Sequence, residues 1–377
     1  MTLLTAMSAA QATEFGEAIR NGGMNLRPST APRLTGALLD LQDGVVPSKL
    51  VVAVRGSSTT ANSAVSADKK SQAWLERSIA LMQQYAPQVS NAGMFGTNGV
   101  TLANLITYDP RFASIGPGIA LDTTHSLAGY GIQMSAATGS LVWQPNTPYD
   151  RTDIYTTSGG ATRDLGVQFG GGAVNTITTP ALSFQKTTLT KTLGQEPINF
   201  TKGATSGAVI QIVDTYNTAD PRIRFANLGR SGWSTVDWTV ATDARSPFNS
   251  LRALNPLAII LDEGPNAWRD GVPAATMKAK LQTEIDNNID QSDMILASPF
   301  PGSVAAYPSQ VPYQMAIREL AISNNLPLID FTRSLETWEI SNPQGYYRDN
   351  THLTAVRGNG KAARFFARAI RTLVGFD

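Results

Sequence analysis

The chain has 377 residues and a formal net charge of +1, from 30 basic and 29 acidic residues. That balance offers no cationic surplus for nucleic acid or for an anionic membrane surface. The sequence contains no cysteine, which excludes disulfide frameworks, zinc–thiolate sites, iron–sulfur clusters and cysteine nucleophiles. No apolar run approaches the roughly 18 residues that a membrane-spanning helix requires, so we expect a soluble protein without a membrane span.

The N-terminal residues 1–47 are expected to form a lead-in or attachment segment with one short helical stretch, TGALLDLQDG. The first residues, MTLLTAMSAAQATEF, lack a basic region before their short apolar patch, so we expect no classical signal peptide. A strand is expected over residues 50–54, ending in the turn GSSTT. The stretch that follows predicts a helix, because Leu75, Ile79 and Met82 recur at helical spacing.

Residues 96–221 differ in composition from the rest of the chain. This segment is poor in charged residues and rich in glycine, threonine and serine, and it contains short alternating runs such as GSLVWQ, TDIYTT and AVIQIVDTY. Turn signals separate these runs at short intervals, a pattern typical of an antiparallel sandwich or jelly roll without helices. We therefore predict an inserted all-β domain.

Strands and helices alternate again from about residue 222. The run LAIIL is apolar enough to be a strand buried on both faces, and apolar residues four apart predict a helix in ATMKAKLQTEIDNNID. Such alternation on both sides of the insertion predicts one doubly wound parallel sheet, formed by residues 48–95 and 222–377. Ligands of such sheets bind at the carboxyl ends of the strands.

Four segments lie at these predicted strand ends or in a late loop: RGSST, NLGRSGWS, EGPNAW and YYRDNTHLTAVRG. They resemble, in the right order, the four consensus blocks of the SGNH (GDSL-type) hydrolases. The resemblance covers residues 48–87 and about 222–377. It implies an α/β fold: a flavodoxin-like three-layer α/β/α core with a parallel sheet, into which the all-β domain (residues 96–221) is inserted.

The resemblance also implies a set of catalytic residues. Ser58 would be the nucleophile, His352 its base and Asp349 the carboxylate that orients the histidine. The backbone N–H groups of Ser58 and Gly229 and the side-chain amide of Asn266 would form the oxyanion hole. These roles agree with general chemistry, because a serine hydroxyl needs a base to become nucleophilic and an oxyanion needs donors already aimed at it.

The nucleophile block departs from the family pattern. Ser57 stands where the family has aspartate, so either Ser57 or Ser58 could be the nucleophile, and the Gly-x-Ser spacing together with Thr60 favours Ser58. The residue before the glycine is Arg55, which is also unusual.

Only two histidines are present, His125 and His352. A second Asp-x-x-His, Asp122 to His125, lies within the insertion with no terminal helix after it, and we expect an ordinary loop there. Two distant histidines without cysteine make a poor zinc ligand set, so neither a metal nor an organic cofactor is expected.

The inserted domain suggests the substrate. An inserted β-sandwich at this position resembles the carbohydrate-binding insertions of SGNH O-acetylesterases that act on cell-wall or capsular polysaccharides. Trp233 and Trp268 each follow a catalytic block and could stack on sugar rings, although core or rim positions would explain them equally well. Trp143 and Tyr149 in the insertion are weaker candidates.

We therefore predict a serine esterase that removes O-acetyl groups from a polysaccharide through an acetyl-enzyme. Its partner would be an acetylated carbohydrate, with no nucleic acid involved. The Gly/Thr-rich insertion and the apparent lack of a leader favour a phage tail component, hence an extracellular or virion-associated protein that forms a homo-oligomer or joins a virion. The alternatives are a general lipolytic or carboxyl esterase and a non-catalytic carbohydrate-binding structural protein.

Overall fold

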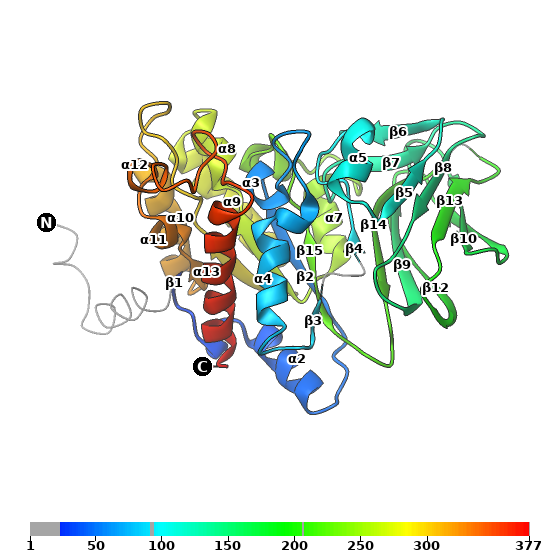
Figure 1. Ribbon diagram of the computed structural model, residues 1–377, viewed down its shortest axis with the longest axis horizontal. Helices are drawn as coiled ribbons and strands as arrows, with labels where there is room; N and C mark the ends of the chain where they lie inside the picture. The colour runs from blue at the N-terminus through cyan, green and yellow to red at the C-terminus, as the bar shows by residue number, and fades with distance from the viewer. Residues whose placement is uncertain (1–22, 91–93, 206, 377) are drawn as a thin grey trace, which may run out of the picture.

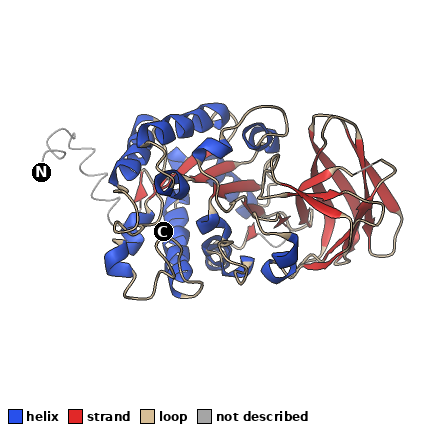
Figure 2. Cartoon of the chain, turned by 90° about the horizontal axis from the view of Figure 1, so that it is seen from above, coloured by secondary structure: helices blue, strands red, loops and turns tan. Residues whose placement is uncertain are grey.

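A computed structural model describes residues 23–90, 94–205 and 207–376. It shows two regions side by side, one built of helices around a sheet and one built of antiparallel strands (Figures 1 and 2). Of the predicted lead-in, residues 1–22 lie outside the described residues. The remainder contains the short helix η2 (Pro28–Thr30) and helix α2 (Pro32–Gln42), which lies against the helical region.

The helical region contains a seven-stranded sheet in the order β1-β18-β17-β16-β2-β15-β3. Its strands are β1 (Gly23–Met24), β2 (Val51–Gly56), β3 (Val89–Ser90), β15 (Ile223–Asn227), β16 (Ala258–Asp262), β17 (Asp293–Ala297) and β18 (Leu328–Ile329). All neighbours pair in parallel except β1, which joins the edge strand β18 antiparallel. Every residue of β2, β15, β16 and β17 is buried, as expected of strands covered on both faces.

Helices cover both faces of this sheet. Because side chains alternate along a strand, Val52 and Val54 pack with α2, α4 (Trp74–Met82) and α13 (Arg357–Val374). Val51 and Ala53 pack on the other face with α7 (Pro247–Leu254), α9 (Ala274–Asn288) and α10 (Val311–Ser323). Two apolar cores therefore hold the sheet in place.

The second region consists of two antiparallel sheets. One has five strands in the order β11-β10-β13-β8-β5, and the other has six, in the order β12-β9-β14-β7-β6 with β4 paired to β14. The strands are β4 (Met94–Phe95), β5 (Phe112–Ile115), β6 (Ile119–Asp122), β7 (Gly131–Met134), β8 (Ser140–Trp143), β9 (Tyr149–Thr157), β10 (Arg163–Phe169), β11 (Val174–Thr179), β12 (Phe184–Gly194), β13 (Ile198–Lys202) and β14 (Val209–Tyr216). Leu165 and Phe200 of the first sheet share one core with Ile154 and Ile210 of the second, so the sheets pack face to face as a sandwich.

The predicted fold class, a flavodoxin-like core, is wrong for this chain. In the described residues the antiparallel sheets together hold more strands than the seven-stranded sheet, and that sheet has an antiparallel edge strand. The prediction relied on apolar strands such as β16 and β17, whose composition indicates that both of their faces are buried. The two-residue strands β1 and β3 are too short to produce any periodicity in the sequence.

The prediction of an insertion free of helices is also wrong. Helix α5 (Leu102–Tyr108) follows β4 and buries Leu105 and Tyr108. Its seven residues span about two turns, too few for a helical period to stand out among alternating runs. None of the helices in the described ranges is both long and apolar enough to cross a membrane.

Candidate active site

Three adjacent parallel strands bring three of the four sequence blocks together. β2 ends at Gly56 before Ser58, β15 ends at Asn227 before Gly229, and β16 ends at Asp262 before Asn266 on α8 (Gly264–Arg269). Since β15, β2 and β16 are neighbours in the sheet, their carboxyl ends lie at the same edge. The fourth block, with Asp349 and His352, lies in the loop before α13.

Ser58 is the first residue of the short helix α3 (Ser58–Ala61). A Cβ atom on Gly56 would lie 2.1 Å from Thr60 Oγ1 and 2.8 Å from the carbonyl oxygen of Asp262, so only glycine fits between strand and helix. Ser57 caps the helix, because its side chain accepts the N–H of Thr59 at 3.3 Å. Ser58 Oγ instead lies 2.9 Å from His352 Nε2.

His352 is held by Asp349. Its Nδ1 lies 2.8 Å from Asp349 Oδ2 and 3.0 Å from Oδ1, a contact that places a proton on Nδ1 and leaves Nε2 free to accept one. Asp349 Oδ1 also accepts the backbone N–H groups of Thr351 and His352. Partial burial raises the pKa of Asp349, but these bonds from His352 and Thr351 outweigh it and hold that pKa well below its usual range.

Hydrogen bonds and an ion pair fix the loop that carries Asp349 and His352. Arg348 forms an ion pair with Asp68, in which Nη2 lies 3.0 Å from Oδ2, and its backbone N–H donates to the carbonyl of His352. Trp338 Nε1 donates to the carbonyl of Asp349 at 3.1 Å. These contacts fix the position of the loop that holds His352.

Two of the three predicted oxyanion donors make bonds within the protein. The N–H of Gly229 donates to Asn227 Oδ1 at 3.1 Å, and Asn266 Nδ2 donates to the carbonyl of Trp233 at 2.7 Å. An amide nitrogen carries two N–H groups, so Asn266 keeps a second donor, whereas Gly229 would have to share its one. The N–H of Ser58 begins α3, where the first amides have no acceptor within the helix.

Glycine is required at position 229 by close packing. A Cβ atom there would lie 2.6 Å from the backbone nitrogen of Ala61 and 3.0 Å from Thr60 Cβ. The loop after β15 therefore packs directly on α3, and Gly229 lies beside the helix that begins at Ser58.

The structure does not support Trp268 as a sugar-stacking residue. Its side chain is 1% exposed, and its Nε1 donates to the carbonyl of Pro308 at 2.7 Å, so no ring face is available to a ligand. Trp143 and Tyr149 are fully buried in the sandwich core. In the sequence, Trp268 follows a motif, and Trp143 and Tyr149 lie in or beside alternating runs. Neither position shows whether an aromatic ring lies at the surface or in the core.

Trp233 is partly exposed and lies close to the site. The guanidinium carbon of Arg230 lies 3.5 Å from the centroid of its ring, and Trp238 packs edge-on at 4.6 Å. Arg230 also donates from Nη2 to the carbonyl of Thr123 at 2.6 Å, and burial lowers the pKa of Arg230 to about 10. Arg230 therefore joins the loop after Gly229 to the sandwich, a contact that the sequence motif did not reveal.

The second Asp-x-x-His forms a loop, as expected from the sequence. Asp122 Oδ1 accepts the backbone N–H groups of Thr124 and His125. His125 Nδ1 lies 3.4 Å from Asp122, and its Nε2 lies 3.7 Å from Asp243. The imidazole thus lies between Asp122, at the end of β6, and Asp243, in the segment before α7.

The unusual Arg55, on β2, belongs to a buried charge cluster. Its guanidinium bonds both oxygens of Glu284, at 2.7 and 3.0 Å, and lies 3.0 Å from Glu263. Burial raises the pKa of Glu284 to about 7 while Arg55 opposes that rise. Nearby, burial raises the pKa of Asp262 to about 8, although Thr60 donates to it at 2.7 Å. An arginine therefore precedes Gly56 because its positive charge balances the buried carboxyl groups of Glu263 and Glu284.

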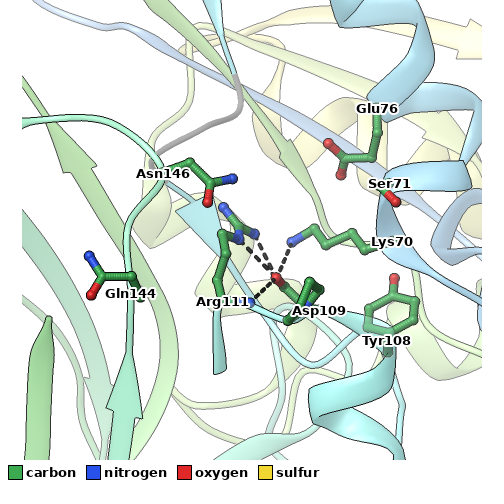
Figure 3. A pocket seen from close by; sticks show the side chains of 9 residues that line it. Lys70, Ser71, Glu76, Tyr108, Asp109, Arg111, Gln144 and Asn146 are labelled. Atoms are coloured by element: carbon green, nitrogen blue, oxygen red, sulfur yellow. Dashed lines mark hydrogen bonds and ion pairs between the residues drawn. The ribbon is translucent and has the colours of Figure 1, made fainter. Parts of the chain in front are cut away.

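A cavity of about 420 Å³ lies between the two regions (Figure 3). Asp109 lines it, 2.6 Å from Arg111 and 3.9 Å from Lys70. Burial raises the pKa of Glu76, against the opposing effects of Lys70, Arg111 and a hydrogen bond with Asn227. Tyr108 lines the same cavity and donates its hydroxyl to the carbonyl of Ala61 at 2.5 Å, so the cavity adjoins the last residue of α3.

Comparison with known proteins gives low similarities. No family model matches the chain, and no curated protein matches it. Among solved structures, protein YxiM of Bacillus subtilis is 13% identical, with 66% of this chain and 88% of that one covered, at a TM-score of 0.35. A protein assigned as a GDSL-like lipase, from Parabacteroides merdae, is 15% identical, with 40% and 73% covered, at 0.33.

A third similar structure is a family 35 carbohydrate binding module from Clostridium thermocellum. It is 10% identical, with 28% of this chain and 91% of that one covered, at a TM-score of 0.24. The chain is thus weakly similar to a GDSL-like lipase and to a carbohydrate-binding protein. Such values establish no activity, so the proposal below rests on the geometry around Ser58.

Proposed function

We propose that the chain is an SGNH-type serine esterase that removes O-acetyl groups from a polysaccharide. One observation carries the proposal: Ser58 Oγ, the His352 ring and the Asp349 carboxylate lie in one continuous line of hydrogen bonds, with contacts of 2.9 and 2.8 Å. A serine, a histidine and an acid in this relation form the constellation that activates a hydroxyl for acyl transfer.

The reaction follows from these contacts. Ser58 Oγ attacks the acetyl carbonyl carbon as His352 Nε2 accepts the hydroxyl proton, and Asp349 stabilises the resulting imidazolium. The tetrahedral intermediate collapses when His352 returns the proton to the sugar oxygen, which leaves with the bond to the acetyl carbon broken. Water then attacks the acetyl-enzyme, again with His352 as base, to release acetate and restore Ser58. The oxyanion accepts hydrogen bonds from Ser58, Gly229 and Asn266.

A glycan substrate is supported by the sequence resemblance and by polar surroundings. The loops around the proposed nucleophile present the partly exposed side chains of Thr351 and Trp233, a setting suited to hydroxylated ligands more than to a long acyl chain. An extracellular or virion-associated setting, with a homo-oligomeric or virion partner, is part of this proposal. A general carboxyl esterase with the same triad is the second candidate.

A substrate comparison tests the proposal. Acetate release from acetylated xylan, acetylated pectin and acetylated bacterial capsule would be measured beside hydrolysis of 4-nitrophenyl acetate, butyrate and octanoate. We expect acetate release from at least one polysaccharide and a preference for acetyl over longer acyl groups, both lost in Ser58→Ala. A preference for octanoate would support the lipolytic alternative. Hydrolysis of none of these esters by the folded protein would contradict an esterase and favour a non-catalytic role.

A further inference from the structure

Asn98 connects the antiparallel sandwich to the proposed active site. It lies just after β4, its side chain is fully buried, and its φ of 53° is a left-handed conformation that asparagine tolerates better than most residues. Its backbone N–H donates to the carbonyl of Ala128 at 2.9 Å, and its own carbonyl accepts the hydroxyl of Ser63 at 2.9 Å. The residue is therefore fixed to the sandwich at one end and to the segment after α3 at the other.

The side chain of Asn98 faces the loop after β15. Its Nδ2 lies 2.8 Å from the carbonyl oxygen of Asn227, 3.1 Å from Asn227 Oδ1 and 3.1 Å from the carbonyl oxygen of Gly229. Asn227 Oδ1 in turn accepts the N–H of Gly229. Hydrogen bonds thus hold the backbone of Gly229 on both of its polar sides, one directly from Asn98 and one through Asn227.

The same contacts extend to the nucleophile helix. Asn227 Nδ2 donates to the carbonyl of Thr60 at 3.0 Å, and Thr60 lies two residues after Ser58. A continuous path of hydrogen bonds therefore runs from Ala128 in the sandwich through Asn98 and Asn227 to α3. Asn98 and Asn227 on this path bond Gly229, and Thr60 belongs to the same short helix as Ser58.

We propose that Asn98 is a positioning residue, which holds the Gly229 amide where the tetrahedral oxyanion forms. This inference rests on the proposed esterase function. A donor must lie 2.7–3.1 Å from the oxyanion to stabilise it, and a displacement of about 1 Å can lower a rate by ~10²-fold. Without Asn98 the carbonyl of Gly229 loses its side-chain donor. Asn227 Oδ1, which accepts the Gly229 N–H, also loses the N–H that fixes its own position, so the Gly229 amide is held less firmly.

A positioning role and a purely structural role affect different measurable quantities. A structural residue contributes to the free energy of unfolding alone. A residue that positions an oxyanion donor contributes to binding of the tetrahedral state while leaving binding of the planar ester almost unchanged. The turnover number and the affinity for a tetrahedral analogue should therefore fall together, with KM unaltered.

The test compares Asn98→Gly with Asn25→Gly. Glycine accepts the left-handed backbone, so N98G removes the side-chain donor with little strain. Asn25 is a matched control, because it also has a left-handed backbone, with a φ of 52°, and donates from Nδ2 to the carbonyl of Leu326. It follows the edge strand β1, and β18, β17 and β16 separate β1 from β2, the strand that leads to Ser58. The measurements are kcat and KM for 4-nitrophenyl acetate, the inhibition constant of phenylboronic acid, which forms a tetrahedral adduct with the serine, and the unfolding temperature.

We expect N98G to lower kcat by roughly 10- to 100-fold and to weaken the boronic acid by a similar factor, with KM within about twofold, while N25G changes neither kcat nor inhibition. Unchanged kcat in folded N98G would overturn the positioning role while the esterase stands. A wild-type protein without esterase activity would overturn the proposed function and this inference with it. If N98G does not fold, Asn98→Asp keeps the shape and the tolerance of a left-handed backbone, replaces the donating Nδ2 by an acceptor oxygen, and is judged by the same criteria.

Discussion

The two regions of the molecule contribute to the proposed site in different ways. The helical region supplies Ser58, Gly229 and Asn266 from the ends of adjacent buried strands, which two apolar cores hold in place. The sandwich supplies none of the proposed catalytic groups. Two of its residues nevertheless bond the loop after β15: Asn98 donates to the carbonyl of Gly229, and the carbonyl of Thr123 accepts a hydrogen bond from Arg230. In this proposal the helical region carries the catalytic groups, and the sandwich helps to position one of them.

The largest expected effect is on the chemistry itself. Ser58→Ala and His352→Ala should each lower kcat by roughly 10³- to 10⁶-fold, because each removes a member of a unit that acts together. Steady-state hydrolysis of 4-nitrophenyl acetate measures the loss. Ser57→Ala is the matched control, since it removes a neighbouring hydroxyl that caps α3, and it should affect stability more than turnover. Equal losses in S57A and S58A would contradict the assignment.

Asp349→Asn should lower kcat by about 10³- to 10⁴-fold with little change in the unfolding temperature. The amide that replaces the carboxylate no longer favours a proton on Nδ1, so Nε2 cannot accept the serine proton, and its neutral charge no longer stabilises the imidazolium; the comparable change in serine proteases costs ~10⁴. Asp349→Glu, which keeps the charge, should lose less. Full activity in D349N would show that the hydrogen bond to His352 has no catalytic role.

The two tryptophans after the catalytic blocks should separate stability from binding. Trp268→Ala should destabilise the protein by about 3–5 kcal/mol, because it empties a buried site in the core of the helical region. Trp233→Ala leaves that core intact and should weaken hydrolysis of the polysaccharide more than hydrolysis of 4-nitrophenyl acetate. Thermal unfolding and paired kinetics measure the two effects. Equal destabilisation by both variants would place Trp233 in the core as well.

A smaller effect concerns the pH dependence of stability. The pKa of Asp262 rises from 3.8 in an exposed chain to about 8 in the fold, so the folded state binds the extra proton. Its stabilising contribution is complete below about pH 4 and is lost as the pH rises through 8. Asp262→Asn imitates the protonated form and should flatten the fall in stability between about pH 4 and 8 by roughly 1–3 kcal/mol. Denaturant unfolding at several pH values measures it, and identical slopes in both proteins would refute an uncharged Asp262.

The sequence predicted the approach of Ser58, Asp349 and His352 better than it predicted the architecture. The blocks stand at ends of long apolar strands, and parallel pairing of such strands must bring those ends together. The fold class was mispredicted because two-residue strands such as β1, and the seven-residue helix α5, leave no measurable periodicity.

Contacts between the regions were also invisible in the sequence. Nothing local in the sequence relates Asn98 to Gly229, which lies 131 positions later, or distinguishes the core residue Trp268 from a surface ring. Such relations depend on tertiary packing, which a single sequence does not display. The proposed catalytic motif was recognisable in the sequence because its chemistry restricts residue type and spacing. The position proposed for Asn98 carries neither restriction.

The most direct measurement of the central claim is the reaction of the protein with a fluorophosphonate, followed by intact mass and peptide mapping. The account predicts one adduct, on Ser58, which is absent from Ser58→Ala and much slower to form in His352→Ala. An adduct on Ser57 would contradict the geometry in which Ser58 Oγ faces His352. The absence of any adduct in the folded protein would contradict the esterase itself.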